Sequence, residues 1–240
     1  MRRFWTSRGY AVCDVDYGGS TGYGKEYRRR LRGSWGIVDV DDVCAAATFL
    51  VDQGLADPKR LAIDGGSAGG FTTLGALAFK EVFTAGCSLY GVADLGVLAG
   101  DTHKFESRYL DGLVGPYPEE KAKYDERAPI NAVDQLSCPI LLLQGDEDKI
   151  VPPNQAELMH AAMLNKGLPC ALKIYKGEQV WHARSNSGTQ DRTLARRIES
   201  LARGVLPTPP HESELTITFD TTSLAARLPT GSKHRGCSQL

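Results

Sequence analysis

The segment at residues 63–70, IDGGSAGG, constrains the fold of this chain more than any other feature. It places Ser67 in a G-x-S-x-G pattern between a β-type run at residues 60–64 and a helix-compatible apolar run at residues 71–79. A strand, a tight glycine turn and a helix form the context in which this pattern holds a nucleophilic serine. Glycines suit such a turn because a Cβ on its flanks would clash with the neighbouring strand and helix.

Ser67 is therefore expected at the N-terminus of a helix, where free N–H groups and the helix dipole favour developing negative charge. The alternative is a Gly/Ser-rich βα loop that only packs, or that cradles a phosphate group. Because a strand and a helix flank the pattern on its two sides, the sequence favours a serine hydrolase.

Strand-like and helix-like segments alternate over residues 9–179. The strand-like segments are residues 9–16, 60–64, 85–90, 139–144 and 171–175, and the helix-like segments are residues 39–53, 71–79 and 155–165. This alternation predicts an α/β fold with a mostly parallel sheet flanked by helices. The nearly continuous apolar run at residues 139–144 is typical of a central parallel strand that is covered on both faces.

The alternation stops after Gln179. Residues 180–240 are rich in Arg, Ser, Thr and Pro, and we predict that they form an irregular, disordered tail. Residues 215–219 alternate like a strand, but they do not extend the βα pattern. We therefore expect a domain at residues 1–179 followed by this tail.

Charge and cysteine content exclude several classes of protein. The formal net charge of −1 gives no electrostatic reason to expect nucleic acid or an anionic membrane as a partner. The basic cluster Arg28–Arg30 with Arg32 is interpreted as the solvated face of a helix. No signal peptide or membrane-spanning segment is visible in the sequence.

The six cysteines show neither a C-x-x-C pair nor metal-ligand spacing. Five of them lie in or beside apolar runs, which favours buried free thiols over a disulfide framework. We therefore expect a reducing compartment, the cytoplasm. The serine hydrolase chemistry implies neither a metal nor an organic cofactor.

An acidic cluster follows the apolar run at residues 139–144. Asp146, Glu147 and Asp148 lie where a strand is expected to end, and open α/β sheets place their sites at the carboxyl ends of strands. A nucleophilic serine needs a base that a third group orients, and in α/β-hydrolases the acid follows the serine along the chain. The alternative is a solvated acidic turn.

Five segments together resemble the catalytic domain of the prolyl oligopeptidase family of serine peptidases. They are residues 17–24 (YGGSTGYG), 35–40 (WGIVDV), 65–70 (GGSAGG), 88–95 (SLYGVADL) and 148–152 (DKIVP). The resemblance covers about residues 4–179 in unbroken order and implies an α/β-hydrolase fold that hydrolyses peptide bonds through an acyl-enzyme. It implies Ser67 as the nucleophile, Asp148 rather than Asp146 as the triad acid, and the Ala68 N–H as an oxyanion donor.

The histidine of the family follows the last strand, where this chain has Val180. His182, two residues later, is the candidate base, whereas His103, His160, His211 and His234 are interpreted as surface residues. Gln179 and Val180 fit a CAG codon followed by GT, the form of a splice donor. We therefore interpret residues 180–240 as translated intron or frame-shifted sequence.

Three aromatic residues, Tyr90, Phe105 and Tyr109, are candidates for the walls of a substrate pocket, although such residues are more often plain core. The resemblance also begins part-way through the family's domain, upstream strands being absent. An unpaired sheet edge is therefore expected, and with it self-association.

The sequence thus favours a serine peptidase of prolyl oligopeptidase type, with peptides as substrates. One alternative is a general carboxylesterase, which shares the serine turn. The other is a catalytically impaired fragment or pseudoenzyme, suggested by the displaced histidine and the missing strands. Labelling by a fluorophosphonate probe, and turnover of esters against peptide anilides, separate these three readings.

Overall fold

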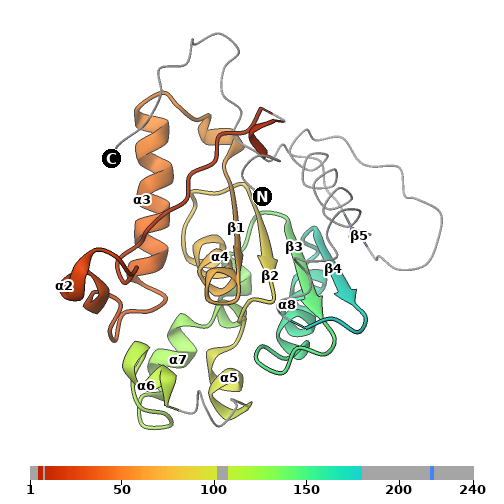
Figure 1. Cartoon of the computed structure of the whole chain (residues 1–240). Helices are drawn as coiled ribbons and strands as arrows, with labels where there is room; N and C mark the ends of the chain where they lie inside the picture. The colour runs from red at the N-terminus through yellow and green to blue at the C-terminus, as the bar shows by residue number, and fades with distance from the viewer. Residues whose placement is uncertain (1–4, 8, 102–107, 180–216, 219–240) are drawn as a thin grey trace.

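The structure is a computed structural model that describes residues 5–7, 9–101, 108–179 and 217–218. Its centre is a sheet with the strand order β1-β2-β3-β4-β5 (Figure 1). The strands are β1 (Ala62–Gly66), β2 (Ala85–Leu89), β3 (Ile140–Gly145), β4 (Cys170–Tyr175) and β5 (Ile217–Thr218). The first four strands run parallel, and β5 pairs antiparallel with β4. The predicted α/β fold with a mostly parallel sheet is confirmed.

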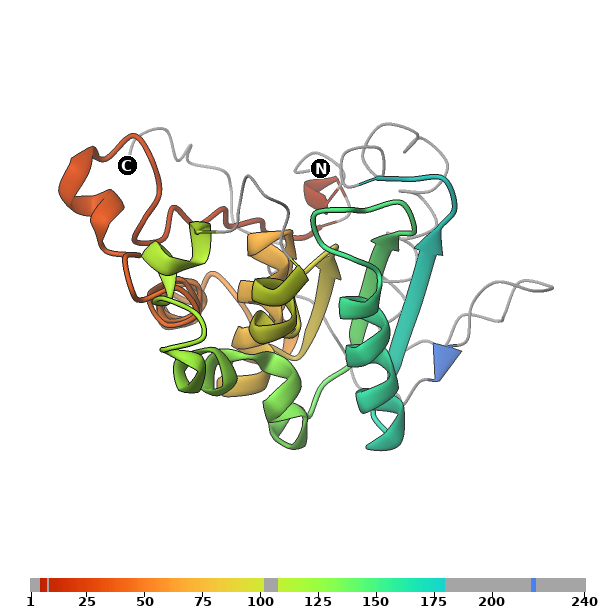
Figure 2. The same ribbon diagram turned by 90° about the horizontal axis from the view of Figure 1, so that it is seen from below.

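Helices and two short 3-10 segments connect the strands. They are α2 (Gly24–Arg29), α3 (Val38–Asp52), η1 (Pro58–Arg60), α4 (Ala68–Phe79), α5 (Leu95–Asp101), α6 (Tyr109–Leu113), α7 (Lys121–Arg127), η2 (Pro129–Gln135) and α8 (Asn154–Asn165). Helices α4 and α8 lie on the same side of the strands (Figure 2). Helices α3, α4 and α8 confirm the helices predicted at residues 39–53, 71–79 and 155–165, with small shifts at their ends.

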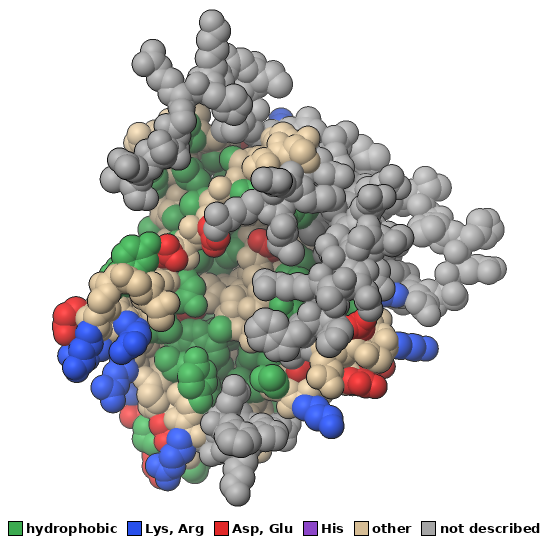
Figure 3. Space-filling model, viewed as in Figure 1, with side chains coloured by type: hydrophobic (Ala, Val, Ile, Leu, Met, Phe, Trp, Pro, Cys, Tyr) green, Lys and Arg blue, Asp and Glu red, His purple; other side chains and the backbone are tan. Residues whose placement is uncertain are grey.

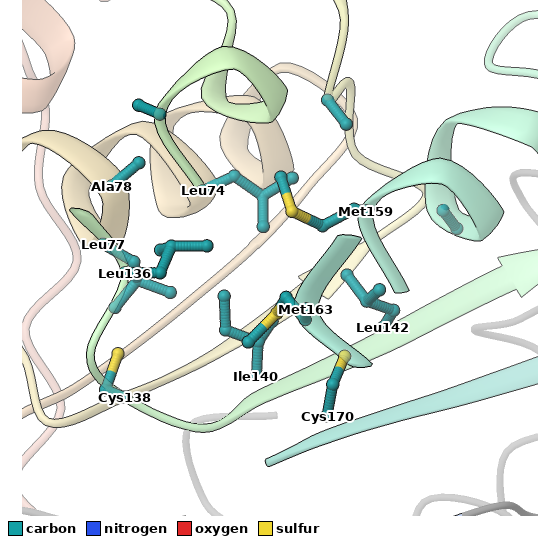
Figure 4. Packing of buried hydrophobic residues seen from close by; sticks show 13 residues of the cluster. Leu74, Leu77, Ala78, Leu136, Cys138, Ile140, Leu142, Met159, Met163 and Cys170 are labelled. Atoms are coloured by element: carbon teal, nitrogen blue, oxygen red, sulfur yellow. The ribbon is translucent and has the colours of Figure 1, made fainter. Parts of the chain in front are cut away.

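Strand β3 is buried along its whole length and carries the core on both faces. Its residues Ile140 and Leu142 pack with side chains of α4 and α8 (Figure 4). Its residues Leu141 and Leu143 belong to a second cluster with Cys87 and Ala171. Because successive side chains of a strand point to opposite faces, burial on both faces requires the continuous apolar run seen in the sequence.

The predicted strand at residues 9–16 is wrong. Residues 11–16 have no strand assignment, and residues 11–15 line a cavity of about 600 Å³ together with β1 and the apolar side chains of α3. A strand exists only through hydrogen bonds to a neighbouring strand. Residues 11–15 and β1 both line the cavity and do not pair with each other.

The exposure of the cysteine thiols agrees with the absence of a strand at residues 11–16. Cys44, Cys87, Cys138 and Cys170 are buried and free, as predicted, but Cys13 is free and exposed. Cys13 lies in the segment that does not pair as a strand, so the burial expected from its apolar neighbours is lost. Cys237 lies outside the described residues.

The basic cluster has the solvated position predicted for it. Helix α2 has no buried residue, and Lys and Arg side chains gather over it at the left edge of Figure 3. Within the described ranges, no helix has the length and apolar character needed to cross a membrane.

The predicted tail at residues 180–240 lies outside the described residues, with the exception of β5. Strand β5 falls within the segment 215–219 that alternates in the sequence. The division of the chain after Gln179 stays a prediction.

Candidate active site

Ser67 lies at the junction between β1 and α4, where the chain turns sharply from strand to helix (Figure 1). Its backbone has φ 56° and ψ −119°, a conformation that side-chain-bearing residues rarely adopt. Such a conformation costs about 1–3 kcal/mol and persists only where the surroundings enforce it. Here the Ser67 N–H donates to the Leu89 carbonyl at 2.9 Å, and the Phe71 N–H donates to the Ser67 carbonyl at 3.1 Å.

Two of the glycines around Ser67, Gly65 and Gly70, are required by close backbone approach. A Cβ on Gly65 would lie 2.3 Å from the Gly69 carbonyl oxygen, and one on Gly70 would lie 2.6 Å from the Gly91 Cα. A Cβ on Gly66 would lie 2.8 Å from the Tyr90 hydroxyl. Contacts this short with backbone atoms cannot be relieved by rotating a side chain. The predicted steric reason therefore applies to Gly65 and Gly70, but not to Gly69, where an added Cβ would have nothing within 4 Å.

Ala68 is the first residue of α4, so its backbone N–H has no acceptor within the helix. The positive end of the helix dipole lies at the same place. These two properties are those required of an oxyanion donor next to Ser67. The role itself stays a prediction.

Hydrogen bonds run from Ser67 across the carboxyl ends of three parallel strands. Gly66 of β1 pairs with Leu89 of β2, which pairs with Leu143 of β3. Beyond Leu89, the Tyr90 N–H donates to the Leu143 carbonyl at 2.6 Å. The turn that holds Ser67 and the end of β3 are therefore fixed to the same edge of the sheet.

The structure distinguishes the two candidate acids that follow β3. Asp148 is buried, and its Oδ1 accepts hydrogen bonds of 2.9 Å from both the Ile150 and Val151 N–H groups. Asp146 is exposed, and its Oδ1 accepts from the Gly177 N–H at 2.7 Å. Asp148 thus has the fixed, buried carboxylate that orienting a histidine requires, whereas Asp146 ties its turn to the segment after β4.

Gln144, the polar end of the apolar run, was not singled out from the sequence. Its side chain is fully buried, and its Nε2 donates to the Val151 carbonyl at 3.0 Å. The same Nε2 lies 3.4 Å from Asp148 Oδ2. Gln144 therefore closes the loop that carries Asp148. A polar residue at the end of a wholly apolar strand is the signal that could have found it.

The chain returns to this loop at the end of the described domain. The Glu147 N–H donates to the Glu178 carbonyl at 3.1 Å, and a Cβ on Gly145 would lie 2.3 Å from that same oxygen. The described chain thus reaches Gln179 beside the turn that carries Asp148. His182 and Val180 lie outside the described residues.

The three predicted pocket residues have different outcomes. Tyr90 is buried, has φ 41°, and lies against Gly66 on the inner side of the turn. Tyr109 lies on α6 and is 60% exposed. Phe105 lies outside the described residues, and a common pocket of the three stays a prediction.

His160, interpreted as a surface residue, lies on α8 and is half-buried rather than exposed, and burial lowers its pKa.

No group of three or more His, Cys, Asp or Glu side chains arranged to hold a metal ion occurs among the described residues. The groups described at this edge of the sheet are a strained serine, a helix N-terminus and a buried carboxylate, which suit nucleophilic chemistry.

The model of the prolyl oligopeptidase family, Peptidase_S9, matches residues 2–202. The chain belongs to the prolyl oligopeptidase family. The match passes Gln179, where the resemblance was expected to end, and covers the segments that hold Ser67 and Asp148. Similarity to solved α/β-hydrolase peptidases confirms the α/β-hydrolase fold.

Relatives of known name are similar over most of this chain. Dipeptidyl aminopeptidase BIII of Pseudoxanthomonas mexicana is 31% identical over 184 residues, which cover 74% of this chain and 27% of the relative. Acylamino-acid-releasing enzyme 1 of Oryza sativa subsp. japonica is 31% identical over 159 residues, which cover 62% of this chain and 20% of the relative.

Among solved structures, a puromycin-hydrolyzing peptidase of Mycobacterium tuberculosis is 46% identical with a TM-score of 0.82. The match covers 90% of this chain and 33% of that protein. A puromycin hydrolase is 43% identical with a TM-score of 0.80, over 89% of this chain and 32% of that protein. The chain thus spans about a third or less of the length of each of these relatives.

Proposed function

We propose that this protein is a serine peptidase that cleaves peptide bonds through an acyl-enzyme on Ser67. The observation that carries this proposal is the strained backbone of Ser67 at the start of α4. Buried Asp148 supports it, since the carboxyl ends of adjacent strands bring its loop to the same edge of the sheet. The names of the relatives, among them an aminopeptidase and a puromycin-hydrolyzing peptidase, agree with hydrolysis of this kind.

In the proposed reaction the Ser67 hydroxyl attacks the substrate carbonyl carbon and gives its proton to His182. The oxyanion of the tetrahedral intermediate accepts a hydrogen bond from the Ala68 N–H. The leaving amine takes the proton from His182, and water then releases the acyl group by the same steps. Asp148 orients the histidine. The support for His182 is its position three residues after Gln179, where the chain lies beside the loop of Asp148.

Covalent labelling tests the nucleophile. The full chain is treated with a fluorophosphonate probe, and the labelled peptide is identified by mass spectrometry. We expect label on Ser67, none in Ser67→Ala, and unchanged labelling in Ser88→Ala, a buried serine in β2 whose hydroxyl lies 3.4 Å from the Gly70 carbonyl oxygen. Absence of label from the wild type contradicts the proposal and favours a catalytically impaired fragment or pseudoenzyme.

Turnover of puromycin, peptide anilides and p-nitrophenyl esters tests the substrate class. Faster cleavage of amides, lost in His182→Ala, supports a peptidase with His182 as base. Faster cleavage of esters with no amide turnover supports a general carboxylesterase instead.

We propose further that two copies of the chain associate through the edge of the sheet formed by β1. Among the described strands β1 is an end strand, and it lines the cavity of about 600 Å³ with residues 11–15. Exposed strand edges pair with other chains, and a lysine on such an edge opposes pairing. In analytical ultracentrifugation we expect a dimer that Ala62→Lys converts to a monomer. A wild-type monomer at tens of micromolar contradicts this proposal.

The free thiols support a reducing compartment, the cytoplasm, as the proposed location. Fractionation of the source cells, with detection of the protein in each fraction, tests this location. Protein found in the secreted fraction would contradict the proposal.

A further inference from the structure

A buried carboxylate lies next to the helix that begins at Ser67. Asp39, the second residue of α3, has no solvent exposure. Its Oδ1 accepts from the Gly36 N–H at 2.6 Å, and its Oδ2 accepts from the Thr72 hydroxyl at 2.5 Å. Burial raises the pKa of this carboxyl, and the hydrogen bonds from Thr72 and Gly36 act in the opposite direction.

Asp39 joins two helix N-termini. It lies in the first turn of α3, where a negative charge is favoured, and its hydrogen bond reaches Thr72 in α4, 33 residues further along the chain. The loop before α3 contacts α4 a second time, since the ring of Trp35 packs on that of Phe71 with centroids 4.5 Å apart. The start of α4 is therefore held from one side by the Asp39 carboxylate and by this aromatic pair.

Thr72 links Asp39 to Ala68, the residue that follows Ser67. Its hydroxyl lies 2.5 Å from Asp39 Oδ2 and 3.1 Å from the carbonyl oxygen of Ala68, one turn earlier in α4. The hydroxyl has one hydrogen, and the charged carboxylate is the stronger acceptor. With the hydroxyl held by Asp39, Thr72 cannot turn freely in the first turns of α4.

We propose that Asp39, acting through Thr72, is a positioning residue that fixes the first turn of α4 so that the Ala68 N–H meets the developing oxyanion. The inference rests on the proposed function of Ser67. A carboxylate buried without a cation among the described residues is a costly way to hold two helices together, because an apolar contact would pack them at least as well. A directional hydrogen bond instead fixes the rotation of α4, to which transition-state stabilisation is sensitive.

The helix offers a matched pair of variants for the test. Thr72→Val removes the hydroxyl that Asp39 holds. Thr73→Val removes the neighbouring hydroxyl, which is equally buried but has no hydrogen-bond partner among the described residues. Thr72→Ser keeps the hydroxyl and loses only a methyl group.

In the full chain we expect Thr72→Val to lower kcat about tenfold or more, with KM changed less than about twofold. Thr72→Ser is expected to restore kcat to within about threefold of the wild type, and Thr73→Val to leave it unchanged. Equal kcat values for Thr72→Val and the wild type overturn the inference, as does an equal loss in Thr73→Val.

Amide hydrogen exchange tests the same inference without turnover. The Phe71 N–H, which donates to the Ser67 carbonyl, reports on the turn itself. We expect faster exchange at Phe71 in Thr72→Val but not in Thr73→Val. If no substrate is hydrolysed by the wild type, the proposed function fails, and exchange alone decides the inference: equal exchange at Phe71 in the two variants overturns it.

Discussion

At the scale of single residues, the candidate site depends on side chains and backbones that are held in place. Ser67 is strained, and hydrogen bonds to β2 and within α4 maintain the strain. Asp148 is buried and accepts hydrogen bonds from two backbone N–H groups. Neighbouring Asp146 has the same chemistry but is exposed. The difference between the two carboxylates makes their roles separable by mutation.

We predict that Asp148→Asn lowers kcat by about 10³–10⁴-fold, because an amide in its place favours the wrong histidine tautomer. Steady-state hydrolysis of a peptide anilide by the full chain measures the effect. Asp146→Asn is the matched control and is expected to stay within about threefold of the wild type, since its acceptor oxygen for Gly177 is kept.

A larger loss in Asp146→Asn than in Asp148→Asn would reverse the assignment of the triad acid. A thermal melt of each variant separates a loss of activity from a loss of folding.

At the scale of elements, β1 and α4 approach so closely that the turn between them admits no side chain on one flank. The Gly65 position faces the Gly69 backbone, and the Gly66 position faces the ring of Tyr90. The crossing of strand and helix therefore depends on particular glycines and not on glycine content in general. An added Cβ at Gly100 or Gly112, in contrast, would have nothing within 4 Å.

We predict that Gly65→Ala lowers the free energy of unfolding by about 3 kcal/mol, because its Cβ would lie 2.3 Å from a backbone oxygen. Gly100→Ala is the control, since Gly100 is an exposed residue of α5 with nothing within 4 Å of an added Cβ. Its stability is expected to change by less than about 1 kcal/mol, towards greater stability.

Urea denaturation followed by circular dichroism measures both values. Equal stabilities of Gly65→Ala and the wild type would contradict the prediction. They would show that the turn can open enough to admit a Cβ at Gly65 without loss of stability.

At the scale of the whole molecule, buried thiols lie in several elements. Cys44 lies in α3, Cys87 in β2 and Cys170 in β4, and Cys138 lies just before β3. Burial raises the pKa of Cys44 and of Cys138 to about 11 and that of Cys170 to about 12, and it also raises the pKa of Cys87 well above its ordinary value. The native chain therefore keeps these protons at a pH at which the unfolded chain, with thiol pKa values near 9, loses them.

The sign of the pH dependence follows from this proton balance. Between about pH 9 and 11 the native state binds more protons than the unfolded state, so the free energy of unfolding falls as the pH rises. We predict that Cys170→Ala makes this fall smaller by about 2 kcal/mol, because one titrating thiol is removed. Urea denaturation at pH 8, 9.5 and 11 measures the difference between the two slopes.

Cys13→Ala is the control for this measurement. Cys13 is exposed, and its pKa is raised less, by partial burial first and then by Asp14. Its removal is expected to leave the slope nearly unchanged. Identical slopes in the wild type and in Cys170→Ala would show that Cys170 ionises as easily in the native chain as in the unfolded one.

The sequence by itself determined the local elements and the family. The glycine turn around Ser67, the strands β1 to β4 and the helices α3, α4 and α8 are all specified by short patterns of apolar, polar and glycine residues. Such patterns reflect contacts that each segment makes with the rest of the core, and they can be read without knowing the partner. The motif segments carried the family assignment in the same way.

Only the tertiary structure decided the properties that depend on distant partners. Residues 11–16 have a strand-like sequence but no strand assignment in the structure, and Cys13 in this segment is exposed. Burial, which separates Asp148 from Asp146, is set by the packing around β3. The contact between Asp39 and Thr72 joins residues 33 positions apart. A hydrogen bond or a buried contact requires both of its partners, and no local pattern specifies where the chain brings them together.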